Sequence, residues 1–148
     1  MPVPMSTPNN ETPRERPEGF LASRATAMPA DTNPAGHIFG GWLMSQMDLA
    51  GAIHASIRAQ GTVATVAVDG FKFHAPVHVG DEVSCYTEMV RAGKTSISIK
   101  VEAWVRRAGG AIPTRVTSAI YHFVAVGEDY RPRPLPPESD AMKQALLA

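Results

Sequence analysis

The sequence has a single cysteine, no excess of charge of either sign and no long apolar run. Cys85 is the only cysteine among 148 residues, which excludes an intramolecular disulfide framework and a cysteine-rich metal cage. The 14 Lys and Arg residues balance 14 Asp and Glu residues, so the chain lacks the basic surplus typical of proteins that bind nucleic acid or anionic membranes. Residues 1–20 lack the apolar stretch of a signal peptide, and the most apolar segment, 42–57, is too short and too polar to span a bilayer. We therefore expect a cytoplasmic protein without a metal, a nucleic-acid partner or a membrane partner.

The residues that are present favour one folded domain. Hydrophobic residues make up 44% of the chain and charged residues 19%, which is typical of a chain with a packed core. Frequent prolines in residues 1–20 predict a mobile N-terminal tail, because proline cannot donate to helix or sheet hydrogen bonds. Residues 21–137 carry the regular patterns of a domain, and residues 138–148 predict a tail or a short helix.

From Trp42 onward the apolar residues recur at helical spacing. One stripe carries the residues expected to face the core: Leu43, Met47, Ala50 and His54. Further apolar residues surround this stripe nearly all the way round, so we expect a helix to about Ile57 that is buried on most of its surface. Gly61 is suited to the position that follows a helix end.

The remaining pattern is that of strands. A short candidate strand precedes the helix, and after the helix the apolar period drops to two. The candidate strands are 21–27, 62–68, 82–90, 97–105 and 115–126, joined after the helix by turns of hairpin size. One helix must then cover the apolar face of an antiparallel sheet that curls around it, so the predicted fold class is α+β.

A carboxylate, Asp48, lies in the middle of the most apolar segment. Burying an unpaired carboxylate costs roughly several kcal/mol. Asp48 therefore lies either on an exposed stripe of the helix or in a cleft, where it could act as a general base or a nucleophile. Periodicity alone favours neither position.

A loop rich in turn residues, Asn33 to Gly41, precedes the helix. The first N–H groups of a helix and the positive end of its dipole can polarise a carbonyl, and Gly40 and Gly41 would let a ligand approach closely. The alternative is an ordinary glycine entry to a packed helix. Gly40 and Asp48 are eight residues apart, about 12 Å along a helix axis, which is too far for both to touch one carbonyl. If both act on one bond, a second subunit of a C2 dimer completes the site.

The segment from Asn33 to Asp48, NPAGHIFGGWLMSQMD, resembles the signature of hotdog-fold acyl-CoA thioesterases, in particular the YciA-like group. The resemblance covers about residues 21–137 and continues through 65–68, 73, 76–77, 79–81, 95–96, 104–105 and 123–126. It implies a hotdog fold, in which a five-stranded antiparallel sheet wraps around one long helix. It also implies hydrolysis of acyl-CoA to a free acid and CoA, without a metal or redox cofactor, by a dimer that assembles into a trimer of dimers.

The same resemblance assigns roles to individual residues. It makes Asp48 the essential carboxylate, lets Asn33 orient water or the carbonyl, and has Gly40 or Gly41 donate a backbone N–H to the carbonyl. The residues that it places near the substrate are His37, Phe39, Thr65, Val66, Phe73, Lys94 and Ser96. Thr65, Val66 and Phe73 would line an acyl tunnel, although plain core residues would show the same pattern.

Two other functions stay open from the sequence. The pair Gly36–His37 resembles hotdog dehydratases, so an enoyl-CoA hydratase-like enzyme using His37 and Asp48 is one alternative. A non-catalytic acyl-CoA-binding module is the other. A local surplus of basic residues between Arg91 and Arg107 could meet the CoA phosphates, or it could form a solvated strand face.

Overall fold

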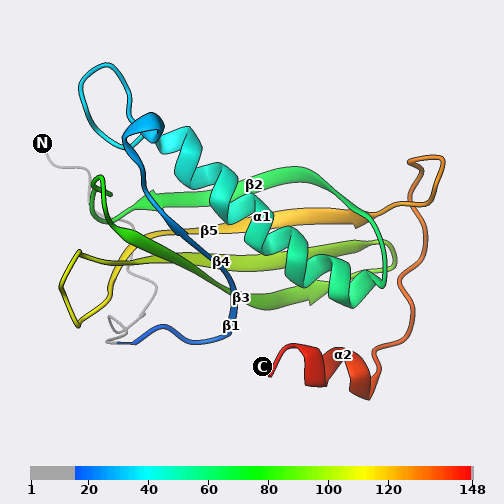
Figure 1. Cartoon of the computed structure of the whole chain (residues 1–148). Helices are drawn as coiled ribbons and strands as arrows, with labels where there is room; N and C mark the ends of the chain where they lie inside the picture. The colour runs from blue at the N-terminus through cyan, green and yellow to red at the C-terminus, as the bar shows by residue number, and fades with distance from the viewer. Residues whose placement is uncertain (1–15, 148) are drawn as a thin grey trace, which may run out of the picture.

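The computed structural model describes residues 16–147 and places one long helix across a five-stranded sheet (Figure 1). The strands are β1 (Phe20–Thr26), β2 (Val63–Phe73), β3 (Glu82–Ala92), β4 (Ser96–Arg106) and β5 (Thr114–Ala125). Their order in the sheet is β1-β3-β4-β5-β2, and every neighbouring pair is antiparallel. The helices are the 3-10 turn η1 (Pro29–Asp31), the long helix α1 (Gly40–Ala59) and the short helix α2 (Asp140–Ala145). The predicted α+β class and hotdog architecture are confirmed.

The core lies between α1 and the sheet. The alternate residues of β4 that face the helix are almost fully buried: Ile97, Ile99, Val101, Ala103 and Val105. The predicted helix stripe is also buried: Leu43, Met47, Ala50 and His54. Gly51 allows the close approach of the two layers, since a Cβ there would lie 2.9 Å from Cζ of Phe123. Burial of each large apolar side chain stabilises the fold by about 1.5–3 kcal/mol.

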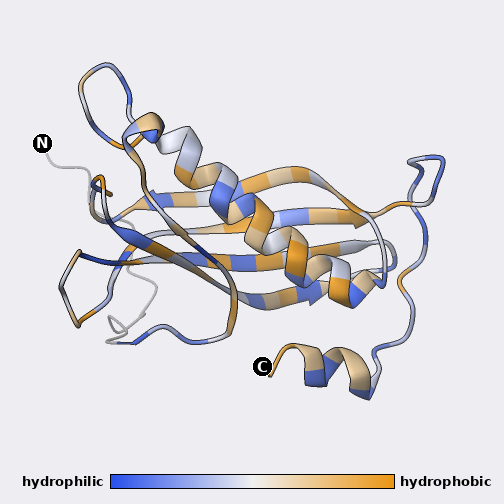
Figure 2. Cartoon of the chain, viewed as in Figure 1, coloured by the Kyte–Doolittle hydropathy of each residue, from blue (hydrophilic) through white to orange (hydrophobic). Residues whose placement is uncertain are grey.

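The expectation that α1 is buried on most of its surface is wrong for the single chain. Leu49 is 59% exposed and Ile53 is 40% exposed, because only one face of α1 packs on the sheet. The neighbouring β2 is an edge strand paired with β5 alone, and its Val66 is 60% exposed. Figure 2 shows apolar residues along the length of both elements. The described part of the chain therefore leaves large apolar side chains exposed on both α1 and β2.

At the end of α1, Gly61 takes its predicted place, directly after the C-cap residue Gln60, but it does not adopt the left-handed conformation usual there. Gln60, not Gly61, takes the left-handed conformation, with φ of 51°. Gly61 serves another purpose, since a Cβ there would lie 2.6 Å from Nη2 of Arg133. That guanidinium donates to the carbonyl of Ala59 at 2.8 Å, so a residue beyond β5 satisfies the end of the helix.

Most predicted element bounds move by one or two residues. The larger difference is that β2 continues to Phe73 instead of ending at Val68. Helix α1 begins at Gly40 rather than Trp42, and α2 is confined to Asp140–Ala145. Of the predicted N-terminal tail, residues 1–15 lie outside the described residues, as does residue 148 of the C-terminal tail. None of the helices within residues 16–147 is both long and apolar enough to cross a membrane.

Candidate active site

The loop before α1 is held together by Asn33. Its Oδ1 accepts hydrogen bonds from the N–H groups of Ala35 and His37, at 3.0 and 3.1 Å. Its own N–H donates to the carbonyl of His37, and Gly36 supplies the left-handed turn with φ of 84°. Two backbone N–H groups of the loop thus occupy the Oδ1 atom of Asn33. The side-chain NH₂ group of Asn33 is the part left to contact a ligand. His37 is exposed on this projecting loop (Figure 1).

The start of α1 faces a small pocket. The carbonyl of Phe39 accepts the first bonds of the helix, from the N–H groups of Trp42 and Leu43. The N–H groups of Gly40 and Gly41 precede those bonds and so have no partner within the helix. A pocket of about 130 Å³ lies beside them. It brings together four residues that the sequence predicted for the site: His37, Phe39, Gly40 and Phe73.

The chain's own packing does not require glycine at the helix start. A Cβ on Gly40 would lie 3.5 Å from Cζ of Phe73, and one on Gly41 would lie 3.8 Å from a ring carbon of Phe39. These are ordinary van der Waals distances, and neither glycine has a positive φ. A methyl group at Gly40 would instead occupy the pocket, which favours close approach of a ligand over a structural need for glycine.

Asp48 lies half-buried on α1 and is held by Thr65. The hydroxyl of Thr65 on β2 donates to Oδ1 of Asp48 at 2.6 Å. Asp48 is therefore neither on a freely exposed stripe nor fully buried, and one of its two oxygens has a fixed partner. Hydrogen bonds to charged groups contribute about 1.5–3 kcal/mol, enough to fix the orientation of the carboxylate.

A residue that the sequence did not single out, Tyr121, supports this turn of the helix. Its buried hydroxyl donates to the carbonyl of Met44 at 2.8 Å. In an α-helix the same carbonyl accepts the N–H of residue 48, so Tyr121 holds the turn that carries Asp48. Burial and, secondly, the negative charge of Asp48 raise the pKa of Tyr121. The only available signal was a side chain with a polar tip at an inward-facing position of β5.

One chain does not bring all the predicted residues together. Gly40 and Asp48 lie on the same continuous helix, about 12 Å apart along its axis. Lys94 and Ser96 lie at the hairpin between β3 and β4, at the far end of the sheet. Phe73 pairs with Thr117, which in turn pairs with Ala103 on β4. Ala103 is seven residues, about 23 Å, from Ser96 along β4, so Phe73 and Ser96 lie near opposite ends of the sheet.

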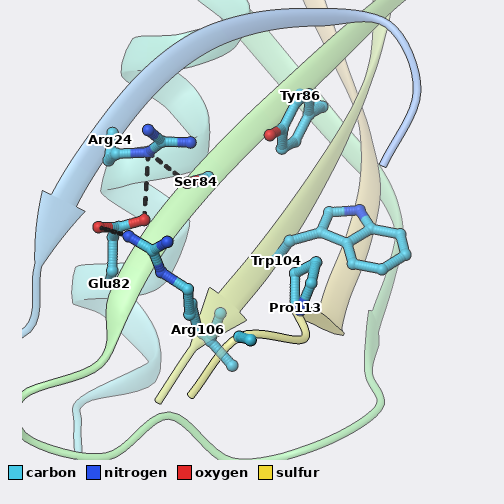
Figure 3. A pocket seen from close by; sticks show the side chains of 9 residues that line it. Arg24, Glu82, Ser84, Tyr86, Trp104, Arg106 and Pro113 are labelled. Carbon is cyan, nitrogen blue, oxygen red and sulfur yellow. Dashed lines mark hydrogen bonds and ion pairs between the residues drawn. The ribbon is translucent and has the colours of Figure 1, made fainter. Parts of the chain in front are cut away.

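The basic residues between Arg91 and Arg107 do not form one patch. Arg107 pairs with Asp81, and Arg106 lies 2.8 Å from Glu82. Both are at the opposite end of the sheet from Lys94. Figure 3 shows Glu82 in contact with the guanidinium groups of both Arg24 and Arg106. These residues line a pocket of about 120 Å³ on the face of the sheet turned away from α1.

Comparisons with known proteins identify the family of this chain. The model of the thioesterase superfamily matches residues 35–112, which include the helix start, Asp48 and Thr65. The chain is 50% identical to the acyl-CoA thioester hydrolase YciA of Escherichia coli K12, over 90% of this chain and 100% of that protein. It is 54% identical to YciA of Salmonella typhimurium, over 81% of this chain and 92% of that protein.

Solved structures show the same relationship. HI0827, a hexameric broad specificity acyl-coenzyme A thioesterase, has a TM-score of 0.81 and 45% identity, covering 89% of this chain and 91% of that one. The hexameric thioesterase y2039 from Yersinia pestis has a TM-score of 0.80 and 51% identity, covering 83% and 100%. The chain therefore belongs to the thioesterase superfamily, in the group of the YciA acyl-CoA thioester hydrolases.

Proposed function

We propose that this chain hydrolyses acyl-CoA to a free carboxylic acid and coenzyme A. The observation that carries the proposal is Asp48, which Thr65 holds on a helix whose glycine-rich start opens onto a pocket. The chain shares about half its sequence with proteins named acyl-CoA thioester hydrolases. That kinship favours hydrolysis over both the enoyl-CoA hydratase and the non-catalytic binding module.

The chemistry follows from the groups available. The N–H of Gly40 or Gly41, at the positive end of the α1 dipole, donates to the thioester carbonyl as its oxygen gains negative charge. Asp48 either takes a proton from the attacking water or attacks the carbonyl carbon itself. In the second case the thiolate leaves from a mixed anhydride, which water then hydrolyses to release the acid and restore the carboxylate. Water is added across the C–S bond, and the sulfur leaves as the thiol of CoA. We assign to the amide of Asn33 the orientation of the water or the carbonyl.

We assign the substrate contacts along the same surface. The acyl group occupies the space beside the helix start, next to His37, Phe39 and Phe73. Thr65 and Val66 lie near Asp48 on β2, so in the proposed dimer they line the part of the site that comes with the second chain's Asp48. The extended CoA carrier runs toward the exposed side chains of Lys94 and Ser96. Lys94 is the charged group there that suits a phosphate.

The proposed active unit is a dimer. The apolar surface of α1 and β2 is uncovered in one chain, and β2 presents the free backbone edge of the sheet. A second copy covering this surface would place its own Asp48 near the helix start of the first chain. Within one chain, Asp48 cannot reach the helix start, because the two lie about 12 Å apart on the same helix. Relatives described as hexameric support three such dimers per assembly.

No metal or redox cofactor takes part in this proposal, because a thioester needs only a polarised carbonyl and a base. Full activity after treatment with a chelator is expected, and a loss that added metal restores would contradict this point. We also propose a cytoplasmic location, since a reducing compartment suits the buried free thiol of Cys85.

Release of free thiol from a panel of acyl-CoA substrates tests the function. Asp48→Asn should lower kcat by about 100-fold or more, because general base catalysis contributes that much. Asp129→Asn, an identical chemical change in an exposed loop, is the matched control and should retain full activity. Undiminished release in Asp48→Asn and Asp48→Ala would contradict the mechanism. Hydration of an enoyl-CoA without thiol release would favour the hydratase.

A further inference from the structure

A chain of side chains crosses three strands on the face of the sheet turned away from α1. Nδ1 of His122 on β5 lies 2.7 Å from Oγ of Ser98 on β4. Nε2 of the same ring lies 2.8 Å from Oδ2 of Asp69 on β2. We name these three residues the cross-strand relay. A neutral imidazole can donate to Asp69 and accept from Ser98, and an imidazolium can donate to both, so both contacts are possible in either protonation state.

The relay is attached to an irregular part of the sheet. The pairing of β2 with β5 is irregular at two places, between Thr65 and Ala67 and again between Asp69 and Lys72. Only three residue pairs lie between these bulges: Ala67 with His122, Val68 with Tyr121 and Asp69 with Ile120. None of these three β2 residues is buried, so burial specifies their register weakly. A slip of one residue would turn every side chain to the other face.

The relay links this short ladder to the interior of the sheet. His122 lies opposite Ala67 and reaches diagonally to Asp69, so its ring spans the ladder between the bulges. Ser98 fixes the other side of the ring from the central strand β4. The side chain of Asp69 is 72% exposed, so its contact with His122 is not forced by burial.

The register of β2 decides where Thr65 points. Thr65 is the last residue before the first bulge, and its hydroxyl meets Asp48 at 2.6 Å on the α1 side of the sheet. A slip at the bulge would turn this hydroxyl away from the carboxylate. We propose that Ser98, His122 and Asp69 hold the register of the bulged edge strand and thereby position Thr65 against Asp48. The inference rests on the proposed function, and the three residues are positioning residues, since none touches Asp48.

Two substitutions break the relay. Asp69→Ala removes an exposed side chain and should leave the fold intact, and His122→Phe keeps a ring but removes both hydrogen bonds. We expect each to lower kcat for thiol release about tenfold, since small misplacement of a catalytic group is costly, while KM stays within about twofold. Asp69→Asn keeps an oxygen that accepts from Nε2–H, so it should retain most of the activity. Wild-type kcat in both Asp69→Ala and His122→Phe would overturn the inference.

A double-mutant cycle shows whether the relay acts through Thr65. In a Thr65→Val background, His122→Phe should cause no further loss of kcat, because the contact that the relay positions is already gone. A full additional loss would overturn the inference. Glu82→Gln is the matched control, because Glu82 ties β3 to Arg24 and Arg106 at a distance from β2 (Figure 3), and its kcat should equal the wild-type value.

The outcomes separate this inference from the function on which it rests. If the wild type releases no thiol, or Asp48→Asn retains full activity, the proposed function fails first. If release depends on Asp48 but not on the relay, only the inference fails.

Discussion

The hydroxyl of Thr65 fixes one oxygen of Asp48 and leaves the other for the proposed role of Asp48 in hydrolysis. Thr65→Val keeps the branched shape that suits a strand and removes only the donor. Because a hydrogen bond to a charged group is worth about 1.5–3 kcal/mol, kcat for thiol release should fall about tenfold to a hundredfold. Thr65→Ser should keep most of the activity. A Thr65→Val enzyme with unchanged kcat would show that Asp48 needs no orienting partner.

Tyr121 gives a residue-scale prediction about stability. Tyr121→Phe removes the hydrogen bond to the carbonyl of Met44. Because that carbonyl still accepts the helical N–H of Asp48, the free energy of unfolding should fall by only about 1 kcal/mol. The raised pKa of Tyr121 means that the folded protein keeps a proton that the unfolded chain loses above pH 10.0. This part of the stability is complete below pH 10.0 and is lost as the pH rises further. Denaturant titrations should show a shallower alkaline decline for Tyr121→Phe, and parallel declines would refute this assignment.

At the scale of elements, a substitution at the start of α1 should change activity without lowering stability. A methyl group at Gly40 meets no close contact in the chain, and alanine favours a helix over glycine by up to about 1 kcal/mol. Gly40→Ala should therefore melt at the same temperature or higher, yet lose about tenfold in thiol release because the methyl group enters the pocket. Full activity of Gly40→Ala would show that the helix start is not part of the active site. One that melts much lower would show that glycine serves the fold.

The packing of α1 on β3 predicts a dependence of stability on acid. Nδ1 of His54 lies 2.8 Å from Oγ1 of Thr87, and burial lowers the pKa of His54 from its usual value of 6.5. The unfolded chain binds a proton below pH 6.5 that the folded protein does not, so the stability present above pH 6.5 is lost as the pH falls. The free energy of unfolding should therefore decrease below pH 6.5, and less steeply in His54→Gln, which cannot be protonated. Equal slopes for the two proteins would contradict this prediction.

For the whole molecule, the sequence pattern predicts the fold better than the site. The period of two in β4 and the stripe from Leu43 to His54 follow directly from which residues face the core. The contact between Asp48 and Thr65 depends on the order of the strands and on a bulge, which residue spacing does not encode. The signature block indicated Asp48 and the helix start, whereas the structure alone revealed Tyr121 and the cross-strand relay.

The same limit explains the wrong prediction for α1. Apolar periodicity reports that a surface is to be buried, but it does not distinguish burial within the chain from burial against another copy. The apolar pattern therefore predicts that Leu49 and Ile53 are buried, although the single chain leaves them exposed. The proposed dimer, with a second copy against this surface, would account for both the apolar pattern and the exposure.

Mixing of inactive subunits tests most directly whether each active site is shared between two chains. Asp48→Asn chains and Gly40→Val chains, each inactive alone, are produced together with different tags. In a mixed dimer one site joins an intact helix start to an intact Asp48 of the other chain, so random pairing should restore about a quarter of the wild-type activity. Purified mixed dimers that release no more thiol than the two parents would contradict a shared site.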